Sequence, residues 1–308
     1  MTYAQVAGNG SAFTAIATST SAPIQARALL VSLTIRLWTA RKGDRTVTSE
    51  VHQQHAAKRS AGIYSKHLLG DARELAAVVT AAGAGRTAHY AATLPWADEG
   101  WRLLPSAQWL DYTERMRAAQ LSFDGAVREL VAAYPRLRDE ARSTLGSMYR
   151  ATDYPNERRV ADRYGWEVNF SPIPSGDDIR LTLDSDAVDN VRSSVENRVT
   201  AAVNAAARDC WARLHSAVSH IHERLSDKEA IFRDSLIANA RDLVDVLARL
   251  NVTDDPALDV MRQRVESLLV PPAALRADAD LRAAKANEAA RILAAMSPYY
   301  APDAESAS

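Results

Sequence analysis

Apolar residues recur with a helical period between Val188 and Leu225. Ten steps over 37 residues give a spacing of about 3.7, which keeps these positions on one face of a nearly straight helix. The positions are Val188, Val191, Val195, Val199, Val203, Ala206, Cys210, Leu214, Val218, Ile221 and Leu225. Asp184 and Ser185 are suited to cap this helix, which at about 1.5 Å per residue is expected to be roughly 60 Å long.

Further helices are predicted after this long one. Residues 226–229 (SDKE) form a capping box that starts a helix reaching about Leu250. Asp255-Pro256 starts another, which ends before Pro271-Pro272, and the alanine-rich residues 273–296 are expected to be helical. These shorter helices follow after short breaks, so they are the first candidates to cover the apolar face of the long helix.

A period of two, typical of strands, occurs in the first half of the chain. Residues 31–37 alternate between apolar and polar side chains, which predicts a half-buried strand over about 29–38. Residues 166–170 and 179–183 also alternate, and the proline- and glycine-rich stretch between them predicts a β-hairpin. We expect strands at these places only, and we expect the first strand and the hairpin to share one small sheet.

The remaining helices are predicted between these strands, at about 48–69, 72–82 and 106–134. Gly83-Ala84-Gly85 is expected to end the second of them and Pro135 the third. A turn is expected after the first strand, at 41–45, and a packed loop at 94–105.

Together these patterns predict an α+β, predominantly α-helical fold, with a small antiparallel sheet or ribbon and a long-helix hairpin or bundle. Residues 1–26 are rich in Ala, Ser, Thr and Gly and are expected to form a flexible arm. A mixed α+β region is expected at 27–183, the helical hairpin or bundle at 184–296, and a flexible tail at 297–308.

The composition narrows the class of protein. The formal net charge of −1 argues against a general nucleic-acid binder, so any basic function has to come from a local patch. The single cysteine, Cys210, rules out an intrachain disulfide and favours a reducing compartment. The N-terminus has no secretory pattern, and the most apolar stretch, 28–38, is too short to span a bilayer. We expect a cytoplasmic protein that does not bind membranes.

One segment departs from this neutral balance. Between residues 30 and 70, seven cationic residues face two acidic ones, Asp44 and Glu50, which gives +5 (7 − 2) and leaves −6 for the rest. The cationic residues are Arg36, Arg41, Lys42, Arg45, Lys58, Arg59 and Lys66. With Trp38 and Tyr64 interleaved, the segment is a candidate to follow a phosphate backbone and to stack on a base. The alternative is a solvated helix face paired with the acidic remainder of the chain.

No pattern of residues predicts catalysis. The chain has no phosphate-binding loop, so nucleotide hydrolysis is not expected. His52 and His55 share a helix face, but a zinc site needs a third ligand from His67 or His89, so a surface pair is the simpler interpretation. Cys210 lies on the apolar face, where a neutral thiol packs as a small hydrophobic group. We therefore expect no catalytic residue, metal or cofactor.

Four segments carry a resemblance to a known family. They are residues 33–42 (LTIRLWTARK) with Asp44, residues 94–105 (LPWADEGWRLLP), residues 153–155 (DYP) and residues 166–180 (WEVNFSPIPSGDDIR). In this order they resemble uncharacterised proteins of tailed bacteriophages and prophages, over most of residues 29–225. The resemblance implies a bacterial host cell and no catalytic residue. Some such proteins are similar in setting to partners of MoxR-like or cobaltochelatase-like ATPases, which implies an AAA+ ATPase as a partner.

Three classes of function follow. The first is a phage or prophage structural or interaction protein without catalytic activity, acting by self-association or by binding a protein partner. A homo-oligomer is expected here, with Val199 and Leu214 on its seam. The alternative is an accessory protein that binds DNA or RNA through the basic segment. The second alternative is a metal-dependent enzyme of an unfamiliar type, with His52 and His55 as its starting point.

Overall fold

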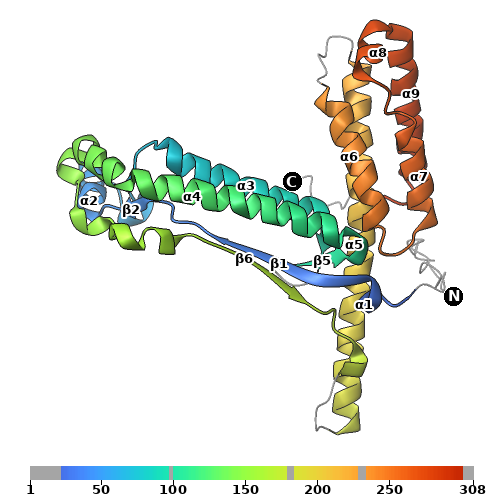
Figure 1. The fold of residues 1–308 in the computed structure, drawn as a ribbon, viewed down its shortest axis with the longest axis horizontal. Helices are drawn as coiled ribbons and strands as arrows, with labels where there is room; N and C mark the ends of the chain where they lie inside the picture. Colours follow the sequence, from blue (N-terminus) through green and yellow to red (C-terminus); the bar gives the residue numbers. More distant parts are fainter. Residues whose placement is uncertain (1–21, 97–99, 179–183, 228–233, 301–308) are drawn as a thin grey trace, which may run out of the picture. The chain divides into compact units, whose positions relative to one another are not determined.

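A computed structural model describes residues 22–96, 100–178, 184–227 and 234–300. The chain divides into two compact units, and each is described by itself. Residues 29–172 form what we call the sheet unit; the described residues of 22–28 and from 173 onward form the helical unit. The fold is α+β and mainly helical, as predicted (Figure 1).

The main sheet has four strands in the order β4-β5-β1-β6. Their bounds are β1 (Ala28–Arg36), β4 (Leu94–Pro95), β5 (Trp101–Pro105) and β6 (Gly165–Ser171). β1 and β6 pair antiparallel from Leu30 opposite Ser171 to Arg36 opposite Gly165. The prediction that the segments near 33 and 168 share one sheet is confirmed. The second half of the predicted hairpin, 179–183, lies outside the described residues.

The two faces of the β1–β6 pair differ in chemistry. Val31, Leu33 and Ile35 are opposite Phe170, Val168 and Trp166, so apolar side chains line one face. The other face carries polar pairs such as Thr34 opposite Glu167. In Figure 1 the helices α3 (Arg73–Ala92) and α4 (Trp109–Leu145) lie side by side along this pair. The apolar face packs in their cores, where Val31 contributes a fully buried side chain.

The expected helix end at Gly83–Gly85 is wrong, because α3 continues to Ala92. The Trp166 ring lies on the backbone of Gly85, and a Cβ there would come within 2.1 Å of the ring. Gly85 is therefore needed for the close approach of helix and strand and does not act as a helix breaker. Its conformational cost in the helix, about 1 kcal/mol relative to Ala, is offset by packing.

The expected helix end at Pro135 is also wrong, because α4 runs through it to Leu145. Tyr134 is fully buried beside the proline, and its hydroxyl donates a hydrogen bond to the carbonyl oxygen of Pro155 at 2.8 Å. Leu137, two residues after the proline, is also buried. The buried side chains before and after Pro135 hold the helix in place, although the proline removes one backbone hydrogen bond.

The region after β1 differs most from the prediction. The expected turn at 41–45 contains β2 (Arg41–Gly43), and the expected helix at 48–69 is a short helix, α2 (Arg45–Gln54). It is followed by β3 (Ser65–His67), which pairs antiparallel with β2 in a separate two-stranded sheet. Likewise, the expected loop at 94–105 contains β4 and β5.

The described residues also form short 3-10 helices. They are η1 (Arg59–Ala61), η2 (Ser106–Gln108), η3 (Gly146–Met148), η4 (Ala151–Asp153), η5 (Glu157–Arg159), η6 (Ala161–Arg163) and η7 (Gly176–Asp178).

The helical unit is built on α5 (Ser185–Ser226), the long helix that the sequence predicts, with the Asp184 side chain accepting the Ala187 N–H at its start. The other helices are α1 (Ile24–Arg27), α6 (Ser235–Leu250), α7 (Pro256–Glu266), α8 (Pro272–Ala277) and α9 (Ala279–Met296). α9, α6 and α7 pack against α5 (Figure 1). Its buried side chains begin only at Ala202, so the first four turns of α5 contribute no buried side chain.

The boundary between the units falls at 172/173, whereas the sequence places it at 183/184. The shift arises because η7 packs on α5, where a Cβ on Gly176 would come within 2.6 Å of the Arg192 side chain. Most of the expected N-terminal arm and residues 301–308 of the expected tail lie outside the described residues. Tyr299 and Tyr300 contact α5, where the Tyr299 ring stacks on Trp211 at 4.6 Å between centroids and the Tyr300 ring lies 4.4 Å from that of His215.

Candidate nucleic-acid interface

The basic segment of the sequence folds around the start of α2. The side chain of Asp44 accepts the N–H groups of Thr46 and Val47 and so caps the helix. Thr48 Oγ1 donates to the Asp44 carbonyl oxygen at 2.6 Å and accepts the Tyr64 N–H at 3.0 Å, which ties α2 to the residues before β3. These contacts fix α2, β2 and β3 relative to one another.

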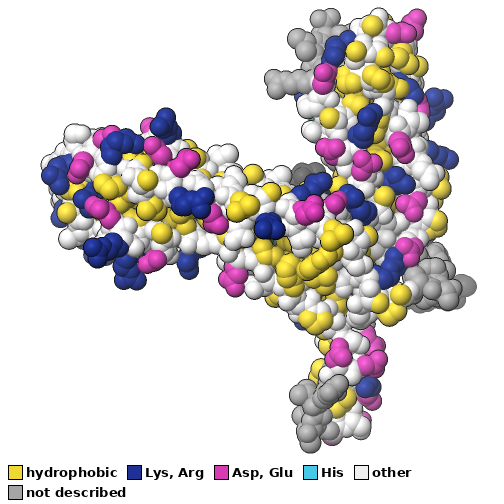
Figure 2. Space-filling view, viewed as in Figure 1, with side chains coloured by type: hydrophobic (Ala, Val, Ile, Leu, Met, Phe, Trp, Pro, Cys, Tyr) yellow, Lys and Arg dark blue, Asp and Glu magenta, His cyan; other side chains and the backbone are white. Residues whose placement is uncertain are grey.

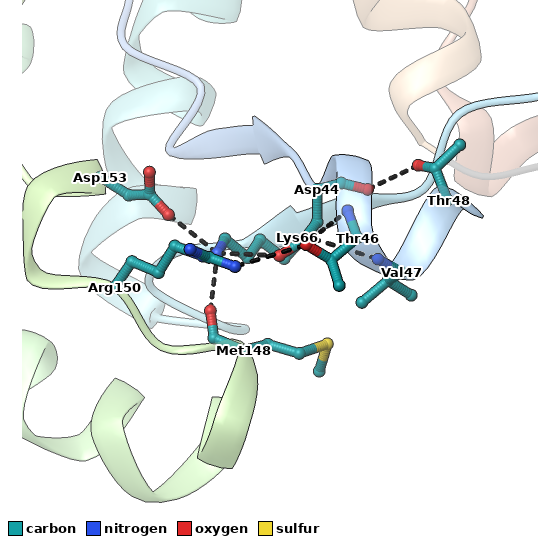
Figure 3. A network of polar contacts seen from close by, with 8 residues as sticks. All are labelled: Asp44, Thr46, Val47, Thr48, Lys66, Met148, Arg150 and Asp153. Atoms are coloured by element: carbon teal, nitrogen blue, oxygen red, sulfur yellow. Dashed lines mark hydrogen bonds and ion pairs between the residues drawn. The ribbon is translucent and has the colours of Figure 1, made fainter. Parts of the chain in front are cut away.

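A buried ion network lies beneath these elements (Figure 3). Lys66 Nζ lies 3.1 Å from Asp44 Oδ2 and 2.8 Å from Asp153 Oδ2, and it donates to the Met148 carbonyl oxygen at 2.6 Å. Asp44 comes from the helix cap and Asp153 from η4, 87 positions after Lys66 (153 − 66). The ammonium group therefore joins the basic segment to the region that follows α4.

The ionisation states of this network follow from its contacts. The hydrogen bond from the Val47 N–H, followed by the one from Lys66, lowers the pKa of Asp44. Burial acts against the charge of Lys66, but hydrogen bonds to Asp153 and Asp44 outweigh it and raise the pKa of Lys66. Both groups are therefore charged near neutral pH, and the ammonium is unsuited to act as a base or a nucleophile.

The structure separates the seven cationic residues of the sequence hypothesis. Lys66 is 2% exposed, so it does not belong to a surface that meets a ligand. Arg36 is exposed at the end of β1, where its guanidinium donates to the carbonyl oxygens of Asp162 and Tyr164. The remaining five are exposed on β2, α2 and the stretch before β3, and they are Arg41, Lys42, Arg45, Lys58 and Arg59.

A further cationic residue joins this group from a distant part of the chain. Arg150 is exposed, and one of its Nη atoms lies 3.4 Å from Thr46 Oγ1 (Figure 3). Arg150 was not among the predicted cations because it lies outside residues 30–70, where the excess of positive charge is found. A charge count over 142–163 gives a signal, with five arginines against three carboxylates. We call Arg41, Lys42, Arg45, Lys58, Arg59 and Arg150 the cationic surface.

The charge of this surface is not neutralised locally. Glu50 is the exposed carboxylate on α2, and the buried Lys66, Asp44 and Asp153 together carry −1 (1 − 2). The six cations therefore leave a local balance of +4 (6 − 1 − 1). Within the described residues, no ion pair involves Arg41, Lys42 or Arg45. Figure 2 shows Lys and Arg side chains gathered on the end of the sheet unit that carries α2 and β2.

The two aromatic residues of the hypothesis have different environments. Trp38 packs edge-on against Tyr134 with centroids 6.0 Å apart, and it belongs to the core. Tyr64 is 39% exposed, and its neighbour Ile63 is 78% exposed. Only the Tyr64 ring is placed to stack on a base beside the cationic surface.

The histidines do not assemble into a site. His52 Nε2 lies 3.0 Å from the Gly62 carbonyl oxygen, and His55 is exposed at the end of α2. His67 is exposed on β3, whereas His89 is buried in α3 with its Nδ1 2.9 Å from the Tyr112 hydroxyl. Over the ranges that the structure describes, no three His, Cys, Asp or Glu side chains are grouped to hold a metal ion.

The other candidate residues lie on α5. Leu214 is fully buried within the helical unit, where it is unavailable to a second chain, and Val199 is half-buried beside Ile24 and Pro174. Cys210 is 1% exposed, with Sγ 3.7 Å from the Leu250 carbonyl oxygen. Burial raises the pKa of Cys210 to about 12, so the thiol stays neutral and unreactive in the folded unit.

Comparisons with known proteins give no further guide: no family model, no curated protein and no solved structure matches this chain. A scan of the helices in the described ranges finds none with the length and apolar character that a membrane span requires.

Proposed function

We propose that this chain is an accessory protein that binds the phosphate backbone of a nucleic acid through the cationic surface. The observation that carries the proposal is the six exposed cations on elements held in place by the buried Asp44–Lys66–Asp153 network. Phosphate recognition needs cations at fixed positions and little else, and it does not require a pocket. A role in handling DNA or RNA also fits the phage or prophage origin that the sequence resemblance implies.

The structure weighs on both alternatives from the sequence. A solvated face paired with the acidic remainder requires ion pairs, but Arg41, Lys42 and Arg45 have none among the described residues. Self-association through the α5 face loses Leu214, because helices of the same chain cover it. Five of the seven cations of the basic segment, by contrast, are exposed on neighbouring elements, and Arg150 joins them.

The mode of binding follows from the side chains present. Lysine and arginine contacts to phosphates carry no base sequence information, so affinity should be similar on all sequences and should fall steeply with salt. Tyr64 adds a stacking partner that a single strand can reach and that a duplex, with its bases already stacked, cannot. We therefore expect a preference for single-stranded DNA or RNA.

The test is fluorescence anisotropy of a labelled single-stranded oligonucleotide at several salt concentrations. The triple variant Arg41→Glu/Lys42→Glu/Arg45→Glu should bind far more weakly. The slope of log K against log salt should fall by about 2, since each lost contact to a single strand contributes about 0.7. The matched control is Arg115→Glu/Arg117→Glu/Arg128→Glu, which makes the same charge change at exposed positions of α4.

Two results would reject the proposal. One is an absence of binding by the parent protein at low salt. The other is an equal loss in both triple variants, which would show that only overall charge matters. Circular dichroism of each variant confirms that the fold is intact.

A further inference from the structure

The main sheet of the sheet unit has an open edge at β6. In the strand order β4-β5-β1-β6, β6 has β1 on one side and no second neighbouring strand among the described residues (Figure 1). The backbone groups of residues 165–171 that point away from β1 therefore lack a partner strand within those residues. Such an edge is a template for pairing with another strand. It carries a single charged side chain, Glu167, and no lysine or proline that would hinder such pairing.

Helix α4 packs on β6 and has an exposed row of side chains. Leu110, Glu114, Arg117 and Leu121 are spaced by four, three and four residues, which places them on one face of the helix. All four are exposed, and the exposed fractions of the two leucines are 73% and 62%. We call these residues the α4 row. An antiparallel copy of the row places leucine opposite leucine and glutamate opposite arginine, so the row is complementary to itself.

The strand and the α4 row have their centres at the same level. The Phe170 ring lies 4.9 Å from the Trp109 ring, and the Trp166 ring lies 5.5 Å from the Phe123 ring, measured between centroids. Val168 is midway between the two strand residues, and position 116 is midway between the two helix residues. The α4 row is centred at 115.5, half the sum of 110 and 121, within one residue of that level. One two-fold axis can therefore pass through the centre of both elements.

We propose that two copies of this chain pair through β6 and α4 about a two-fold axis at Val168. The two β6 strands would run antiparallel, with Val168 opposite its own copy, Trp166 opposite Phe170 and Glu167 opposite Asn169. This register keeps the apolar faces of the two strands on the same side and sets no like charges opposite each other. The contact uses the same surface on both copies, so it closes at a dimer. It does not depend on the nucleic-acid proposal, since none of these residues belongs to the cationic surface.

Cysteine cross-linking tests the register. Leu110→Cys and Leu121→Cys lie at exposed positions, whereas the native thiol of Cys210 is buried. In the proposed dimer these two positions face each other across the axis, but either position is about 16 Å along the helix from its own copy. A short bismaleimide should therefore link an equimolar mixture of the two variants into a dimer and link each variant alone far less. The control is Val79→Cys mixed with Leu121→Cys, because Val79 is exposed on α3. Equal linking in all samples would overturn the inference.

Sedimentation equilibrium of the full chain tests the association itself, at low salt and from about 1 µM to about 1 mM protein. The average mass of the parent should rise with concentration toward that of two chains. Arg117→Glu sets a carboxylate opposite Glu114 of the second copy and should weaken association at least tenfold. Glu114→Arg/Arg117→Glu exchanges the two charges within each chain, keeps the net charge, and should associate as the parent does. Arg115→Glu makes the same charge change at an exposed position off the α4 row and should have no effect.

Two sedimentation results would overturn the inference. One is a parent mass that stays monomeric over the whole range. The other is a charge exchange that does not restore association although circular dichroism shows a folded chain. Arg117 is also changed in the control of the nucleic-acid test, so that test is run at protein concentrations at which the parent sediments as a monomer.

Hydrogen exchange measured by mass spectrometry separates strand pairing from helix contact. The peptide that contains residues 165–171 should exchange more slowly at high than at low protein concentration, because pairing protects the outward backbone amides of β6. Arg117→Glu should remove this difference. Exchange that does not change with concentration in the parent would overturn the inference, because the edge would then be covered within one chain or not at all.

Discussion

Lowering the pH from 7.5 to 5 should destabilise the sheet unit through one buried side chain, His89. The imidazole is 3% exposed, and its Nδ1 lies at hydrogen-bond distance, 2.9 Å, from the Tyr112 hydroxyl. Burial raises the pKa of Tyr112, so the phenol keeps its proton. Burial, and secondarily the charge of Arg102, lowers the pKa of His89 from 6.5 to about 4. The folded protein therefore holds this histidine neutral.

The direction and size of the effect follow from this shift. Below pH 6.5 the unfolded chain takes up a proton that the folded chain refuses, so the free energy of unfolding falls as the pH falls. The loss is about 1.4 kcal/mol per pH unit and ends near the folded pKa of about 4. Between the two pKa values it amounts to about 3 kcal/mol, of which about 2 kcal/mol is lost by pH 5.

Urea unfolding at several pH values measures this loss, with tryptophan fluorescence as the signal, because five of the six tryptophans lie in the sheet unit. His89→Gln can still share a hydrogen bond with Tyr112 through its side-chain amide, which does not titrate, and it should show a flatter pH dependence than the parent. His55→Gln removes an exposed histidine and should leave the pH dependence unchanged. An equal loss of stability in the parent and in His89→Gln would refute the reasoning.

Three further changes give sharp expectations for stability, each measured by urea or thermal unfolding. Gly85→Ala should lower the free energy of unfolding by about 2 kcal/mol, because the new Cβ meets the Trp166 ring. Gly83→Ala, where a Cβ meets nothing within 4 Å, should raise it by up to about 1 kcal/mol. Equal effects of the two variants would contradict the packing role of Gly85. Lys66→Met should cost about 3 kcal/mol, because it leaves buried carboxylates unpaired, and a neutral result would contradict it. Leu214→Asp should unfold the helical unit, and a folded variant would show that this position is not core.

The helices and strands that bury only one of their own faces could be predicted from the sequence, because their apolar residues recur with a regular period. The apolar spacing and the Asp184 cap predict α5 almost to its ends, and the alternation in β1 and β6 predicts their shared sheet. Gly85 and Pro135 misled because their local preference is overridden by packing that comes from elsewhere in the chain. Local preference is only a weak prior where tertiary contacts are strong.

The candidate site shows the same division. Five of the seven predicted cations are exposed on neighbouring elements, and this could be predicted because they lie close together in the sequence. The burial of Lys66 does not, because one of its two carboxylate partners, Asp153, lies far away in the sequence. Arg150 reaches the site for the same reason, since the contact of η4 with the basic segment is a property of the folded unit.

The single thiol of the chain gives the helical unit a signal of its own. Cys210 is closed in between α5 and the end of α6, so a thiol reagent reaches it only when these helices separate. If reclosure is faster than the reaction, the rate of modification reports the free energy of that opening. The loosening of the helices can thus be followed chemically without engineering a second cysteine into the chain, while the tryptophans report mainly on the other unit.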